Sequence, residues 1–159
     1  MKSIIAFTLL VAAFDSTCIA QQEFPVSVTI ATSTPIAKSG ADIRVDVTVV
    51  NTSDHSLRIL RSPDGHAEAI SQIEVRDADG NIPSFLSTGW QKGMAIKKVS
   101  VEPGESNQAF LILTKLYDLA KPGNYTVRLR HEYYESDPSS SNLKRILVPS
   151  NTITINVTE

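Results

Sequence analysis

The feature that most constrains this chain is an alternation of apolar and polar residues with a period of two. Residues 41–49 read ADIRVDVTV, in which every second residue from Ile43 onward is apolar. Successive side chains of a β-strand point to opposite faces, so this pattern predicts a strand with one face in a core and one in water. The same alternation occurs over 24–30 and over 152–158. The sequence therefore predicts a protein built from half-buried strands.

Shorter candidate strands and the turns between them extend this prediction to the whole fold. The additional strands are expected at 57–59, 73–75, 99–101 and 109–113, the last of which is apolar on both faces and is expected centrally in a sheet or under a loop. Pro-Gly and Asp-Gly pairs separate the strands, and DADGN (77–81) predicts a hairpin. Residues 113–119 predict a single helical turn. Together these signals predict an all-β, antiparallel β-sandwich of roughly seven to nine strands.

The first twenty residues have the pattern of a cleavable signal peptide. Lys2 precedes an apolar run over 4–14, which is shorter than the roughly 20 residues needed to cross a bilayer. Small residues before Gln21 predict cleavage between Ala20 and Gln21. The alternative is acylation of Cys18 as a lipoprotein, but Asp15 stands where that pattern has leucine. We predict a signal peptide over 1–20, one domain over 21–159, and a secreted or periplasmic location.

Cysteine content and charge exclude several classes of function. The only cysteine, Cys18, leaves with the signal peptide, which excludes disulfides, thiol catalysis and cysteine metal sites and favours a bacterial envelope protein. The net charge is −2 and the basic residues are scattered along the chain, so no nucleic-acid partner is expected. No second apolar stretch predicts a membrane span in the mature chain. The sequence indicates no cofactor.

The stretch AKPGNYTV (120–127) combines a turn with the start of a strand. Pro122 and Gly123 form the turn signal, and Tyr125 begins the alternating run. This stretch resembles the tyrosine corner of immunoglobulin-type sandwiches, in which a tyrosine hydroxyl bonds to the backbone just upstream. The chain thus resembles cysteine-free bacterial immunoglobulin-like and fibronectin-type modules, with Val127 where antibody domains carry a cysteine. The order of its turns also resembles the intracellular proteinase-inhibitor type of bacterial sandwich. The resemblance implies an immunoglobulin-like fold, with Tyr125, Pro122 and Gly123 in structural roles.

Polar residues that suggest chemistry each have a simpler structural interpretation. His55 and His66 fall in predicted loops, whereas His131 lies on the inward phase of a strand and is expected at the core margin, bonded to backbone. Asp77, Asp79 and Asn81 suggest calcium, but the next spaced acid is missing and a turn explains them better. The glycosylation triplets at Asn51, Asn124 and Asn156 are interpreted as polar strand ends. We predict no metal site and no catalytic residue, because no nucleophile motif is present.

A loop around the only tryptophan is the best candidate for binding. Residues 87–94 (STGWQKGM) place Trp90 between two glycines, close to Lys92 and Met94. Tyr134 ends a strand beside Tyr133, and the opposite phases of the two tyrosines predict that at least one is exposed. We predict a non-enzymatic binding module for a protein or glycan partner, acting as a monomer or weak oligomer through Trp90, Lys92, Met94 and Tyr134. Trp90 as a lid on the core, and a proteinase inhibitor with an exposed loop at 87–94 or 135–142, are the alternatives.

Overall fold

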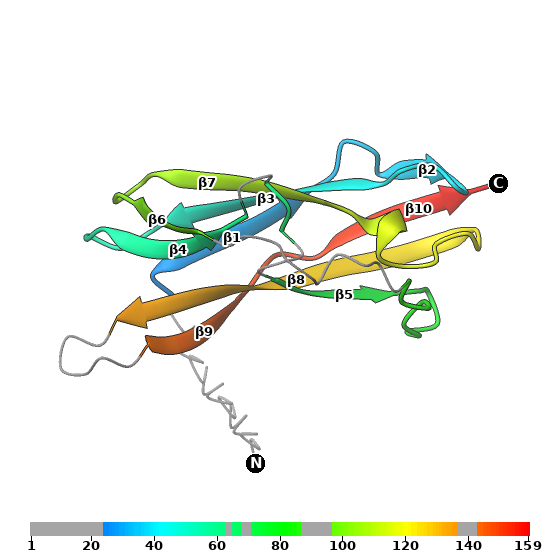
Figure 1. Ribbon diagram of the computed structural model, residues 1–159. Helices are drawn as coiled ribbons and strands as arrows, with labels where there is room; N and C mark the ends of the chain where they lie inside the picture. Colours follow the sequence, from blue (N-terminus) through cyan, green and yellow to red (C-terminus); the bar gives the residue numbers. More distant parts are fainter. Residues whose placement is uncertain (1–23, 63–64, 68–70, 87–96, 137–142) are drawn as a thin grey trace, which may run out of the picture.

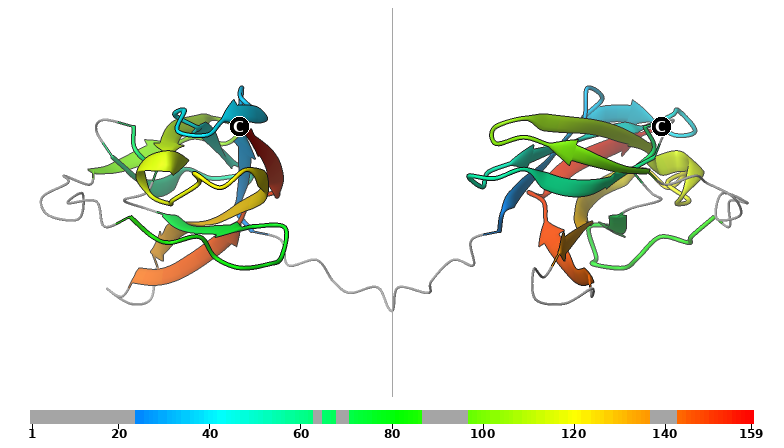
Figure 2. Two further views of the ribbon diagram at one scale, coloured as in Figure 1. Left: turned by 90° about the vertical axis from the view of Figure 1, so that its right-hand side faces the viewer. Right: turned by 60° about the vertical axis from the view of Figure 1, so that its left-hand side comes forward.

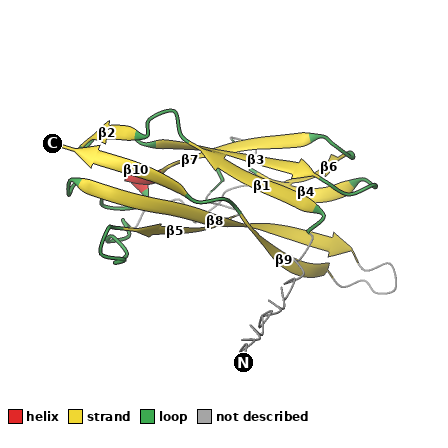
Figure 3. Ribbon diagram, turned by 180° about the vertical axis from the view of Figure 1, so that it is seen from behind, coloured by secondary structure: helices red, strands yellow, loops and turns green. Residues whose placement is uncertain are grey.

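A computed structural model describes residues 24–62, 65–67, 71–86, 97–136 and 143–159. The regular secondary structure of the described residues is strand, apart from one short helical turn (Figure 3). Among the described residues, no helix has the length and apolar character that crossing a bilayer demands. The elements are β1 (Val26–Ala31), β2 (Ile36–Lys38), β3 (Arg44–Asn51), β4 (Leu57–Arg61), β5 (Ser71–Arg76), β6 (Lys97–Val101), β7 (Ser106–Ile112), η2 (Leu113–Lys115), β8 (Gly123–Ser136), β9 (Leu143–Pro149) and β10 (Ile153–Thr158).

The strands form two sheets, which confirms the predicted β-sandwich of immunoglobulin-like class (Figures 1 and 2). The smaller sheet has the order β1-β3-β7 and is antiparallel. The larger sheet has seven strands along the path β2-β10-β8-β4-β6, with β5 and β9 also paired to β8. All pairs in it are antiparallel except β2 with β10. The predicted strands over 24–30, 41–49 and 152–158 correspond to β1, β3 and β10, while β2 and β9 were not foreseen.

The long strand β8 organises the larger sheet. On one side it pairs first with β10 and then with β9; on the other side it pairs with β5 and, further along, with β4. Ser150 marks the change from β9 to β10, because its amide donates to the Leu129 carbonyl and its hydroxyl accepts from the Leu129 amide. In the connection between β4 and β5, residues 65–67 form backbone hydrogen bonds with Phe110 on β7 of the smaller sheet. The apolar strand β7 therefore lies under this loop, one of the two positions expected for 109–113.

The core lies between the sheets and contains the residues on the inward phase of each strand. Val45, Val47, Leu111, Leu129 and Ile155 are at most 1% exposed. Apolar burial of this kind supplies about 25 cal/mol per Å² and is the main source of stability for a domain without disulfides. The period-two pattern of the sequence thus maps directly onto the two sides of each sheet.

Tyr125 makes the hydrogen bond that a tyrosine corner requires. Its side chain is 3% exposed, and its hydroxyl donates to the Lys121 carbonyl at 2.7 Å. Burial raises the pKa of this phenol, with smaller contributions from Asp77 and Asp118. The turn at Pro122 and Gly123 brings Lys121 back beside the ring. The contact connects the segment before β8 to the first buried position of that strand.

Two local predictions were wrong. The DADGN turn forms, with the Asp77 amide bonded to the Asn81 carbonyl and Gly80 at φ +83°, but the residues directly after it, 82–86, do not pair with β5, whose partner is β8. Instead residues 84–86 pair with 116–118 through backbone hydrogen bonds. His131 was expected to bond to backbone, yet its Nδ1 lies 3.2 Å from the Ser71 hydroxyl. The helical turn expected within 113–119 is present as η2.

Candidate functional site

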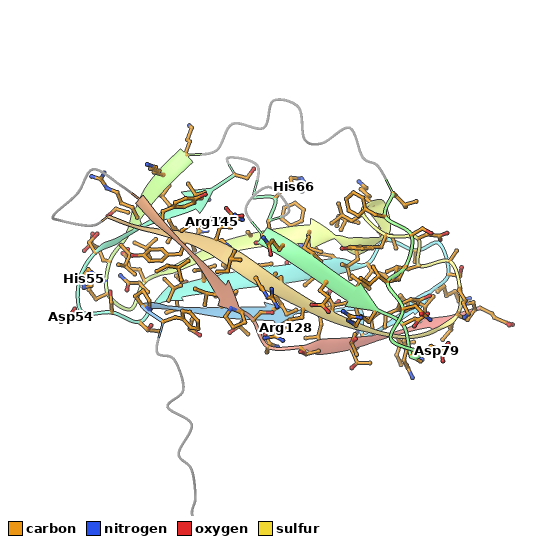
Figure 4. All side chains as sticks on the ribbon, turned by 90° about the horizontal axis from the view of Figure 1, so that it is seen from below. Asp54, His55, His66, Asp79, Arg128 and Arg145 are labelled. Carbon is orange, nitrogen blue, oxygen red and sulfur yellow. The ribbon has the colours of Figure 1, made fainter. Side chains whose placement is uncertain are left out.

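The outer face of the larger sheet carries a concentration of positive charge. The outward side chains of β4, β5, β6, β8 and β9 include two acids, Glu74 and Glu132, and a larger set of cations. We call this surface the basic face; its cations are Arg58, Arg76, Lys98, Arg128, Arg130 and Arg145. The whole chain has a net charge of −2, so this face differs in sign from the protein average. Figure 4 views the molecule from this side and labels Arg128 and Arg145.

The position of these cations follows from the same alternation that builds the core. In β8 the buried residues Val127 and Leu129 alternate with the exposed Arg128 and Arg130. The neighbouring strand β5 places Glu74 opposite Arg128 and Gln72 opposite Arg130. By contrast, the outward residues of β1, β3 and β7 include only one cation and one acid, Arg44 and Asp46, which pair at 2.7 Å. The charge is thus segregated between the two outer faces of the sandwich.

Three of the arginines on the basic face, Arg58, Arg128 and Arg130, form no ion pair with a described acid. The Arg76 Nε donates to a Glu74 carboxylate oxygen at 2.6 Å, and Arg145 pairs with Glu132. The hydrogen bond from Arg76 lowers the pKa of Glu74, which keeps this carboxylate ionised. Arg128 and Arg130 form no ion pair with any described residue. Their guanidinium groups are available to an external anion.

A shallow trough runs between β5 and β8 on this face. One hollow of about 150 Å³ is lined by Gln72, Glu74, Arg128 and Arg130, among others. A second hollow of about 150 Å³ is lined by Glu74, Arg76, Thr126, Arg128 and Thr152, among others. The two hollows share Glu74 and Arg128, so they adjoin along the strands. The trough is open, its floor includes the apolar Ile73, Val127 and Leu129, and its charged groups are one carboxylate and several guanidinium groups.

Tyr134 lies at one end of the basic face. Its hydroxyl donates to Glu132 Oε2 at 3.1 Å, and the other oxygen of Glu132 accepts from Arg145. Burial and the bond to Glu132 raise the pKa of Tyr134. Tyr133, on the opposite phase, is buried against β4. The other candidate binding residues, Trp90, Lys92 and Met94, lie outside the described residues, as do Cys18, the signal segment 1–20 and the loop 137–142.

The three histidines occupy separate environments. His55 is exposed and contacts Asp54 at 2.9 Å, whereas His66 lies against the Phe110 ring with centroids 4.6 Å apart (Figure 4). His131 is 1% exposed, and burial lowers its pKa from 6.5 to about 4. No group of three potential metal ligands occurs among the described residues. Asp77 accepts hydrogen bonds from the Asp79 and Asn81 amides, as an acidic turn residue does.

A larger hollow of about 360 Å³ lies on the outside of the smaller sheet. It is lined by Arg44, Asp46, Thr48, Gln108 and Phe110, among others. The Arg44 guanidinium stacks over the Phe110 ring at 4.2 Å and bonds to Asp46, so its charge is already neutralised. This hollow offers a ligand less unsatisfied charge than the trough between β5 and β8.

Asn51 has a structural role. Its amide is 1% exposed and donates to the carbonyls of His55 and Val101, while its oxygen accepts from the Ser53 amide and hydroxyl. The residue therefore ties the end of β3 to β6 and to the loop before β4. Its burial agrees with the interpretation of this triplet as a strand-end polar residue.

Comparisons with known proteins bear on the fold alone. No protein-family model matches the chain, and no curated relative matches it. The C-terminal domain of Wzt is similar in structure, with a TM-score of 0.50 and 12% identity, over 86% of this chain and 75% of that domain. A CARDB domain from Pyrococcus furiosus, described in complex with di-metal ions, has a TM-score of 0.43 and 13% identity, over 92% of this chain and 100% of that one. A β-glucosidase from Erythrobacter marinus matches with a TM-score of 0.38 and 20% identity, over 79% of this chain and 15% of the enzyme. The first of these likenesses supports the β-sandwich.

The cations of the basic face were missed in the sequence. The six cations come from five strands, so they are scattered along the sequence although they share the outward phase of one sheet. The available signal was local: TVRLRHE (126–132) places arginines at two successive outward positions of one predicted strand. Assigning the outward phase to each strand and counting charge by phase would have revealed the excess.

Proposed function

We propose that this protein is a non-enzymatic binding module that holds an anionic partner on the basic face. The observation that carries this proposal is the segregation of charge: the outward positions of β4, β5, β6, β8 and β9 hold six cations and two acids, in a chain whose net charge is negative. Two of these cations, Arg128 and Arg130, form no direct ion pair with a described acid, although the Glu74 carboxylate lies opposite Arg128. A solvated surface needs no such concentration, whereas an anionic partner gains from it.

The proposal places the module in the cell envelope or outside the cell. The sequence of residues 1–20 supports export, with 21–159 as the mature domain and Cys18 removed with the signal peptide. The partner is a protein or a glycan, and the module acts as a monomer or weak oligomer. Trp90, Lys92 and Met94 are proposed to contribute from the segment that leads into β6, whose Lys98 is part of the basic face.

Binding of dextran sulfate, a polyanion without sequence, tests this function. The test variant is Arg128→Glu/Arg130→Glu. The matched control is Lys38→Glu/Lys115→Glu, which changes the net charge equally at two exposed lysines that line neither hollow, one on η2 and one on β2, which β10 separates from β8. We expect the test variant to lose about tenfold or more in affinity and the control to stay within about threefold of wild type.

Equal losses in the two variants would show that only the net charge matters, and the basic face would then not be a site. Failure of the wild type to bind would refute the proposal directly. Unchanged urea midpoints for both variants are required to show that the comparison concerns binding and not folding.

A further inference from the structure

We infer that the partner is an acidic polysaccharide, a chain of sugars with carboxylate groups, lying along the trough between β5 and β8. This inference rests on the proposed function and specifies its ligand. Arg128 and Arg130 hold the carboxylates, and Glu74 accepts hydrogen bonds from sugar hydroxyls.

The shape of the trough favours an extended chain. Its two hollows adjoin at Glu74 and Arg128 and follow the direction of the strands. Each hollow, at about 150 Å³, is open and shallow, unlike the pockets of several hundred Å³ that enclose compact ligands. Outward residues two apart on β8 are separated by about 7 Å, so Arg128 and Arg130 present charges in a row along the trough.

The cations of the trough are suited to carboxylates. An arginine guanidinium presents parallel N–H donors that match a carboxylate in a bidentate arrangement. Arg130 lies opposite Gln72, whose amide supplies a further donor and acceptor beside the same hollow. Thr126 and Thr152 provide hydroxyls in the neighbouring hollow. The trough therefore alternates charged donors with neutral hydrogen-bonding groups.

Glu74 decides between classes of anion. It stays ionised because Arg76 donates to one of its oxygens at 2.6 Å, and its other oxygen bonds to no described residue. A carboxylate in the middle of a cationic trough repels a ligand that carries only negative charge, such as a phosphodiester backbone. It favours a ligand with hydroxyl donors between its charges. A chain of uronic acids has both groups on each sugar.

The rest of the basic face lacks the groups that other partners use. Tyr134 is the only aromatic side chain among the described outward residues of β4, β5, β6, β8 and β9, and its hydroxyl is held by Glu132. Binding of single-stranded nucleic acid depends on stacking of bases on several aromatic rings. The large exposed apolar residues of the described chain line neither hollow: Ile36 is on β2, Ile82 follows the DADGN turn, and Phe85 and Leu86 are in the segment that pairs with 116–118. The apolar residues that line the trough, Ile73, Val127 and Leu129, are buried or half-buried, so the trough presents no large exposed apolar side chain to a bilayer.

The inference is tested by measuring the affinity of the protein for four soluble polymers in binding titrations. The polymers are polygalacturonate, its methyl ester, polyglutamate and single-stranded DNA. The ester keeps the hydroxyls without the charge, whereas polyglutamate and DNA carry charge without the same array of hydroxyls. We expect polygalacturonate to bind, the ester to lose binding, and the other two polyanions to bind at least about tenfold more weakly. Arg128→Glu/Arg130→Glu should abolish binding of polygalacturonate, and Lys38→Glu/Lys115→Glu should retain it.

Glu74→Ala tests the role of the carboxylate. We expect the ratio of polygalacturonate affinity to dextran sulfate affinity to fall about tenfold, because the hydroxyl acceptor and the like-charge repulsion are lost together. A ratio that does not fall would overturn the role of Glu74. Binding of DNA or polyglutamate as tight as that of polygalacturonate would overturn the inference while leaving the proposed function intact. If the wild-type protein bound neither polygalacturonate nor dextran sulfate, both the inference and the proposed function would be refuted.

Discussion

The free energy of unfolding should fall at mildly acidic pH, and replacement of the buried His131 by a neutral residue should prevent a large part of this fall. The side chain is 1% exposed, bonds through Nδ1 to the Ser71 hydroxyl, and has no hydrogen-bond partner for Nε2 among the described residues. Protonation would place a positive charge in this environment with only the Glu132 carboxylate to favour it. The native state therefore favours the neutral form of the His131 imidazole, and protonation of this ring destabilises the fold.

The magnitude follows from the two pKa values. Burial lowers the pKa of His131 from 6.5 to about 4, so between these values the unfolded chain binds a proton that the native state does not. Stability contributed by the neutral ring is then complete above pH 6.5 and is lost as the pH falls toward 4. The loss in the free energy of unfolding amounts to about 2 kcal/mol at pH ~5 and about 3.4 kcal/mol once the pH is below both values.

Urea unfolding at about pH 7.5 and about pH 5, followed by tryptophan fluorescence or circular dichroism, measures this loss. His131→Gln, which stays neutral, should lose about 2 kcal/mol less than wild type between the two pH values. His55→Gln, which removes an exposed histidine, is the matched control and should follow the wild type. If His131→Gln and wild type lose the same free energy, the imidazole is not held neutral in the core and this reasoning is refuted.

Three further substitutions test the fold. Tyr125→Phe removes the hydrogen bond to the Lys121 carbonyl and should cost about 0.5–1.5 kcal/mol; an unchanged urea midpoint would contradict the corner. Val47→Ala opens a cavity at a fully buried site of β3 and should cost about 1–3 kcal/mol, whereas a negligible change would contradict the inward phase. Asn51→Ala leaves the buried Val101 carbonyl without its donor and should cost about 2–3 kcal/mol, against about 0.5 kcal/mol or less for the exposed Asn124→Ala. Similar losses for the two asparagine variants would refute the structural role of Asn51.

The fold was largely predictable because a strand with one buried face has a period of two. This period located β1, β3, β8 and β10, and the turn chemistry before Tyr125 located the corner. It failed for β2, which has only three residues and an exposed Ile36, and for β9, whose start follows the serine-rich segment. The DADGN prediction failed because turn chemistry fixes a local reversal of the chain but not which strand pairs with the segment that follows.

The candidate site was less predictable because it depends on register between strands. Glu74 and Arg128 are far apart in sequence, and only the antiparallel pairing of β5 with β8 brings them opposite each other. The binding prediction from Trp90, Lys92 and Met94 used local composition alone, and these residues lie outside the described part of the chain. The basic face appears only when the outward phases of separate strands are combined, which requires the topology of the larger sheet.

The most direct test of the account is to map where a polygalacturonate oligomer contacts the protein by NMR. In ¹H–¹⁵N spectra recorded during a titration, the amides of β5 and β8 around Gln72, Glu74, Arg128 and Arg130 are predicted to shift, and those of β1, β3 and β7 to stay in place. Saturable shifts confined to the smaller sheet, or to the segment of Ile82, Phe85 and Leu86, would contradict the claim that the basic face is the binding surface.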